Sequence, residues 1–122
     1  MADNKQYITH VKDEGTIQIS EDVVATIVLN SLSDIEGYAG TSVKPGADIV
    51  ELIGKKNWGK GVKVTISADD SISIDCNVII LYGFSVVTVA GAIQEAVANA
   101  VRSMTGAPSV NVNVNVCGIV RQ

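Results

Sequence analysis

The residue types that most often carry out catalysis are scarce in this sequence and poorly spaced for it. The only histidine, His10, lies in an N-terminal segment without periodicity, so a nucleophilic Ser, Cys or Thr has no evident base. Cys76 and Cys117 form no CxxC motif, and with one histidine they are too few to hold zinc. The adjacent Asp69 and Asp70 follow a predicted strand, which is typical of turn residues rather than of a catalytic carboxylate pair. We therefore predict no catalytic, cofactor-binding or metal-binding residues.

The first candidate binding segment is a basic, glycine-rich loop around the only tryptophan. Lys55, Lys56 and Lys60 flank Trp58 in a stretch that matches neither a Walker A loop nor a GxGxxG motif. Lysines beside an aromatic ring can bind phosphate, an anionic lipid surface or RNA, with the ring stacking on a base. The competing interpretation, which the sequence favours, is a solvated loop whose tryptophan anchors it to the edge of the core.

The second candidate is a row of amide side chains near the C-terminus. Valines at 110, 112, 114 and 116 alternate with asparagines, which predicts a strand with an aliphatic face and an amide face. The strand predicted over 72–80 also has a polar face. Amides donate and accept hydrogen bonds with little charge to desolvate, so this surface is either solvent-exposed or a site of partner contact and self-association. Its candidate residues are Asn111, Asn113, Asn115, Asn77 and Ser73.

The hydrophobic pattern predicts the elements that position these residues in the order β-α-β-β-α-β. Each strand has one aliphatic side, and each helix has one aliphatic stripe, which in the second helix extends from Val86 to Met104. We therefore predict an α+β fold of two layers, with a four-stranded sheet and both helices on one face. Ser20 and Ser85 are expected N-caps, and Gly106 is expected to end the second helix. The predicted strands are 15–19, 62–67, 72–80 and 110–117, and the helices are 21–33 and 86–104.

Length and composition agree with one compact domain. The chain has 122 residues, of which 47% are hydrophobic and only 4% aromatic, so an aliphatic core is expected. Residues 1–14 are predicted to be a flexible tail and 15–122 a single domain. The net charge of −4 argues against a nucleic-acid binder, and the polar N-terminus is not a secretory signal, which favours the cytoplasm. Residues 76–94 are uncharged, but their period changes from strand to helix, so we predict no membrane span.

Several short motifs then occur in an order that resembles a known family. They are GTIQIS at 15–20, IEG at 35–37, KGVKV at 60–64, Tyr82-Gly83, Gln94, and MTG at 104–106 followed by VNVNV at 110–114. Together they resemble the alkaline shock protein family, the Gls-type envelope stress response proteins of Gram-positive bacteria, over residues 15–120.

The resemblance implies a non-enzymatic protein of cell-envelope homeostasis that acts through protein–protein contacts. It further implies a homo-oligomer in the cytoplasm, placed at the inner face of the membrane by a membrane-anchored protein partner. No cofactor and no catalytic residue come with it. The alternative that the residues themselves suggest is an RNA or anionic-surface binding module that uses the Lys/Trp loop at 55–63.

Overall fold

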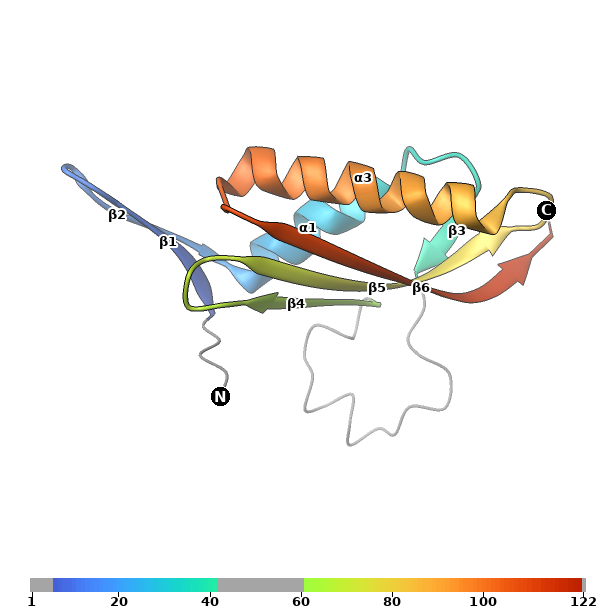
Figure 1. Ribbon diagram of the computed structural model, residues 1–122, viewed down its shortest axis with the longest axis horizontal. Helices are drawn as coiled ribbons and strands as arrows, with labels where there is room; N and C mark the ends of the chain where they lie inside the picture. The colour runs from blue at the N-terminus through green and yellow to red at the C-terminus, as the bar shows by residue number, and fades with distance from the viewer. Residues whose placement is uncertain (1–5, 42–60, 122) are drawn as a thin grey trace, which may run out of the picture.

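The computed structural model describes residues 6–41 and 61–121, in which two helices cover one face of a four-stranded sheet (Figure 1). A separate two-stranded sheet extends away from this body, at the blue end of the chain. The α+β class and the helices on one face are as predicted. In chain order the elements are β1 (Tyr7–Lys12), β2 (Gly15–Ser20), α1 (Glu21–Leu32), β3 (Tyr38–Thr41), β4 (Val62–Ile66), β5 (Ile72–Leu81), α3 (Val86–Thr105) and β6 (Val110–Val120).

The long strand β5 organises the four-stranded sheet. On one side it pairs in parallel with β6. On the other side it pairs antiparallel with β4 along its first half and with β3 along its second half. The predicted hairpin of β4 and β5 is confirmed, and β6 returns after α3 as a parallel border strand, as a strand–helix–strand connection requires.

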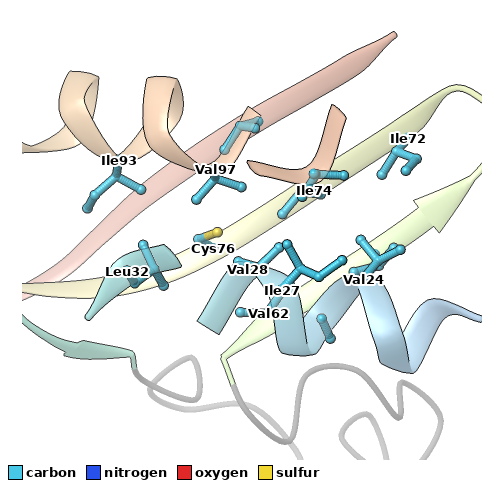
Figure 2. Close-up of a cluster of buried hydrophobic side chains, with 14 of the residues drawn as sticks. Val24, Ile27, Val28, Leu32, Val62, Ile72, Ile74, Cys76, Ile93 and Val97 are labelled. Carbon is cyan, nitrogen blue, oxygen red and sulfur yellow. The ribbon is translucent and has the colours of Figure 1, made fainter. Parts of the chain in front are cut away.

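The core lies between the sheet and the helices and is aliphatic, as the composition predicts. Alternate residues of β4 and β5 point toward the helices, and each helix buries one stripe against them. Figure 2 shows side chains of α1 and α3 meeting those of β5. Fully buried members of this core include Val24, Val28, Leu32, Val62, Ile74, Cys76, Ile93 and Val97.

The helix ends follow the capping residues that the sequence indicates. Ser20 Oγ accepts a hydrogen bond from Val23 N, and Ser85 Oγ accepts one from Thr88 N, both at 3.3 Å. Gly106 has φ of 73°, and its N–H donates to the carbonyl of Arg102. A left-handed backbone at this position favours glycine, so α3 ends where predicted.

The N-terminal region differs from the prediction. Residues 7–12, expected in a flexible tail, form β1, and β2 pairs with β1 instead of joining the four-stranded sheet. The fourth strand of that sheet is β3, which was not predicted, instead of 15–19. β1 was not predicted because only one of its side chains, Ile8, is fully buried, while the others are partly or fully exposed. A strand anchored at one position has no period-2 hydrophobic pattern to detect.

Candidate functional site

Parallel pairing of β5 and β6 brings the predicted amides together on the sheet face that is turned away from the helices. Ser73 lies opposite Asn111, Asp75 opposite Asn113, and Asn77 opposite Asn115. Residues that pair across neighbouring strands point to the same face, so these six side chains form two adjacent columns. The five residues predicted from the sequence are thus contiguous, with Asp75 among them. We call these six residues the amide row.

Cross-strand hydrogen bonds order the amide row. Asn113 Nδ2 donates to Asp75 Oδ1, and Asn115 Nδ2 donates to Asn77 Oδ1, each over 3.1 Å. The asparagines of β6 are exposed, whereas Asn77 is only 2% exposed. The asparagines of β6 form the exposed column of the row, and hydrogen bonds orient Asn113 and Asn115 within it. At Asn77, in the column of β5, the row is shielded from solvent.

Asn77 is the most deeply buried member of the amide row. Its backbone N–H donates to the Gly61 carbonyl over 2.9 Å, and its Oδ1 accepts from Asn115. Its Nδ2 is buried and has no hydrogen-bond partner among the described residues. A buried donor without a partner costs about 1–3 kcal/mol. A buried charge costs more, so a charged side chain introduced at this position is expected to be poorly tolerated.

The two cysteines are free, and the environment of Cys76 does not activate its thiol. Burial, with a smaller contribution from the Asp75 carboxylate, raises the pKa of Cys76 to about 12. A thiol with that pKa stays protonated at neutral pH and is a poor nucleophile. The partly exposed Cys117 lies 3.7 Å from the Asn115 carbonyl through its Sγ, next to the amide row.

The two aspartates of the β4–β5 turn have separate structural roles, which confirms them as turn residues. Asp69 Oδ1 accepts from Ser71 N over 3.0 Å, and this hydrogen bond lowers the pKa of Asp69. Asp70 has φ of 70°, and its Oδ1 accepts from Thr9 N over 3.3 Å. Asp70 thereby ties the turn to β1, and the two carboxylates do not act as a pair.

His10 has a structural contact that its expected place in a tail did not indicate. Its Nε2 lies 2.7 Å from the carbonyl oxygen of Thr105, in the last turn of α3. The carbonyls of a last helical turn lack intrahelical partners, so the imidazole N–H satisfies one of them. Among the described residues, no group of three or more His, Cys, Asp or Glu side chains is placed to hold a metal ion.

Sequence reasoning also missed an apolar groove between the two helices. Its volume is about 590 Å³. Met104, expected in the buried stripe of the second helix, is 68% exposed at its border, because the last turn of α3 presents it to the groove instead of the sheet. Only the packing of the two helices could reveal this groove. The lining residues are Asp22, Val23, Thr26, Ile27, Asn30, Ser31, Ala100 and Met104.

The outer edge of β6 is the second feature that the sequence did not reveal. Ile72 N donates to the Ser109 carbonyl, so the odd-numbered residues at the start of β6 direct their backbone groups toward β5. The even-numbered valines direct theirs outward. Gln94 of α3 confirms this orientation, because its Nε2 donates to the Val112 carbonyl over 3.1 Å. In the part of the chain that the structure describes, no strand pairs with this edge.

The remaining predicted residues, Lys55, Lys56, Trp58 and Lys60, lie outside the described residues. The interpretation of this loop as an RNA or anionic-surface site therefore stays a prediction. Within residues 6–41 and 61–121, no helix combines the length and the apolar character that crossing a membrane requires.

Comparison with known proteins identifies relatives along almost the whole chain. The model of the alkaline shock protein 23 family, described by a cell envelope-related function, matches residues 9–121. The uncharacterized protein YqhY of Bacillus subtilis is 33% identical over 105 residues, covering 86% of this chain and 77% of the relative. The uncharacterized protein Spy1614 of Streptococcus pyogenes is 36% identical over 108 residues, covering 87% and 88%. YloU of Bacillus subtilis, also uncharacterized, is 30% identical over 109 residues, covering 86% and 88%. No solved structure matches the chain.

Proposed function

We propose that this chain, which belongs to the alkaline shock protein 23 family of cell envelope-related function, is a non-enzymatic protein of envelope stress and homeostasis. In this proposal it acts by self-association and by contact with other proteins at the cytoplasmic face of the membrane. The family is not a known enzyme family, and its description relates the family's function to the cell envelope without giving a mechanism.

The observation that carries the proposal is the amide row. Asn113 and Asn115 are exposed yet held by hydrogen bonds to Asp75 and Asn77, so binding would immobilise few free rotamers. Charged residues are depleted at the centres of protein interfaces because desolvating them is costly. Amides avoid that cost and still provide donors and acceptors, so the exposed column of the row suits contact with a protein surface.

The apolar residues that follow the amides on β6 support the same conclusion. Val116 and Ile119 are large and exposed on the helix-facing side of this end of the strand, and Val120, which pairs with Leu81, is exposed on the face of the row. Apolar area beside ordered polar groups is typical of interaction surfaces. The membrane-anchored partner is the part of the proposal that follows from the family resemblance and from the envelope-related family description.

A charge substitution in the amide row tests the proposal. We expect the wild-type protein to exceed the monomer mass in size-exclusion chromatography with light scattering, and Asn111→Lys to shift it toward the monomer. Asn99→Lys, an exposed asparagine of α3, is the matched control and should leave the mass unchanged. Circular dichroism should show that both variants are folded. A wild type that is monomeric at every concentration would contradict self-association.

A second measurement addresses the membrane partner. In a Gram-positive host that encodes relatives, we expect part of the wild-type protein in the membrane fraction after mild lysis. Asn111→Lys should lower that part, whereas Asn99→Lys should not. Equal distribution of the three proteins would count against the amide row as the surface that binds the partner.

A further inference from the structure

The border strand β6 is an unusual sheet edge. Its eleven residues carry no charge, and in the part of the chain that the structure describes no strand pairs with its outer side, where Gln94 Nε2 donates to the Val112 carbonyl. Soluble proteins normally block such an edge with charged side chains, proline or a bulge, because it is a template for pairing with another strand. Here a bulge occurs only late, where Val78 and Ile79 pair with Val116 and Gly118.

We propose that β6 pairs antiparallel with β6 of a second copy of this chain, about a twofold axis at Asn113. The two four-stranded sheets then become one continuous sheet. This inference rests on the proposed self-association and specifies the strand and the register that produce it.

The register follows from which backbone groups point outward. The outward-facing residues before the bulge are the four valines from Val110 to Val116. An axis at Asn113 places Val112 opposite Val114 and Val110 opposite Val116, so all four enter hydrogen-bonded pairs. An axis at Val112 or Val114 would bring Pro108 or the bulged segment into the pairing and lose bonds.

The side chains of β6 are chemically compatible with those of a second β6. With no charge in β6, the twofold axis brings no like charges together. In the same register Asn113 faces its own counterpart and Asn111 faces Asn115. The exposed column of the amide row therefore continues across the axis as amide opposite amide, with each group offering both a donor and an acceptor.

The flank of α3 above this edge leaves space for a second copy. Val87, Gly91 and Ala98 share the flank of Gln94, because they lie seven and three residues before it and four after it. Val87 is 82% exposed, and a Cβ added at Gly91 would meet no atom within 4 Å. Small or exposed apolar side chains at these positions let the second α3 approach over the joined sheets.

Disulfide trapping tests the register directly. In a Cys117→Ser background, the Asn113→Cys residues of the two copies lie opposite each other as a non-hydrogen-bonded antiparallel pair. The Cα separation of such a pair is about 4.5 Å, which is within disulfide range. Asn111→Cys does not face itself, and Asn99→Cys on α3 reports random collision. Under mild oxidation we expect Asn113→Cys to form dimers about tenfold faster than either control, because pairing raises the effective thiol concentration.

Three outcomes overturn the inference, and they distinguish its failure from the failure of the proposed function. Slow crosslinking of Asn113→Cys in a protein that is still oligomeric overturns edge pairing and leaves self-association standing. Faster crosslinking of Asn111→Cys than of Asn113→Cys overturns the register. A protein that is monomeric throughout overturns both this inference and the proposed self-association.

A proline provides a second, backbone-level test. Val114→Pro removes an outward N–H that the pairing with β5 does not use, and Val114→Ala shortens the same side chain but keeps that N–H. We expect Val114→Pro to be folded and monomeric and Val114→Ala to remain oligomeric. A folded Val114→Pro that keeps the wild-type mass overturns edge pairing. If Val114→Pro does not fold, the crosslinking rates decide.

Discussion

Gln94 of α3 reaches down to β6 and donates from Nε2 to the carbonyl oxygen of Val112 over 3.1 Å. A helix side chain thus occupies one of the outward-facing groups of the border strand. The same carbonyl would accept a backbone hydrogen bond from a paired second copy. Gln94 therefore competes with the pairing that the β6 edge favours.

Removal of this contact should have opposite effects on the monomer and on its assembly. We expect Gln94→Ala to lower the free energy of unfolding of the monomer by about 0.5–1 kcal/mol, the net value of one hydrogen bond. The dissociation constant of the dimer should fall about five- to thirtyfold, because pairing no longer displaces a Gln94 in each of the two copies. Sedimentation equilibrium measures the second effect, with Asn99→Ala as the control. A weaker dimer in Gln94→Ala would show that the glutamine supports pairing instead.

Asn77 should be far more sensitive to charge than the exposed asparagines of the amide row. Asn77→Asp buries a carboxylate among backbone and amide groups, and we expect a loss of about 3 kcal/mol or more. Asn77→Ala removes one hydrogen bond and also the unpaired Nδ2, so a loss of about 1 kcal/mol is expected. Asn111→Asp, on the exposed end, should change stability by less than about 0.5 kcal/mol. Urea unfolding at pH 7 measures all three, and equal losses would contradict the dry environment of Asn77.

The contact of His10 with Thr105 should anchor the β1–β2 hairpin to the end of α3. We expect His10→Ala to lower stability by about 1 kcal/mol and to speed amide hydrogen exchange in residues 7–20 more than in β5. Val11→Ala is the matched control in the same strand, because Val11 is 80% exposed. Unchanged exchange in the hairpin of His10→Ala would show that Ile8 and Asp70 hold it without the imidazole.

The buried thiol of Cys76 should limit stability at high pH. Its pKa is raised from the ordinary 9.0 to about 12 in the folded chain, so its protonated form is favoured by folding. This contribution is fully present below pH 9 and is lost as the pH rises toward about 12, where the thiol must ionise in both states. The free energy of unfolding should therefore decline over that range, and by less in Cys76→Ala measured against its own value at pH 8.

Alkylation tests the different solvent accessibility of the two cysteines without a measurement of stability. At pH 8 we expect iodoacetamide to modify native protein once, at the partly exposed Cys117, and denatured protein twice. Native Cys117→Ser should remain unmodified, as mass spectrometry would show. Rapid modification of Cys76 in native Cys117→Ser would contradict its burial.

The amide row was accessible from the sequence because its pattern is local. Asn111, Asn113 and Asn115 alternate with valines, and a period of two places them on one face of any strand they form. That Ser73 and Asn77 belong beside them followed from a two-layer α+β fold. The pairing of Asn115 with Asn77 and the burial of Asn77 depend on the parallel register of β5 and β6, which alternation alone does not fix.

The N-terminal hairpin and the edge of β6 that no described strand covers could not be inferred in this way. His10 acquires its role from a carbonyl 95 residues later in the chain, and β1 has only Ile8 as a buried anchor. Gln94 meets Val112 because α3 crosses above the sheet border, and no spacing in the sequence encodes that crossing.

The sequence by itself determined the two described helices and their caps, four of the six described strands, the aliphatic core and the side chains that share each face, since these depend on neighbours within a few residues. Tertiary structure alone decided which strands pair, which edge no other described strand covers, and where the two helices leave a groove. Those outcomes depend on free energies summed over contacts between distant segments, where several arrangements can satisfy the same local pattern and only packing selects among them.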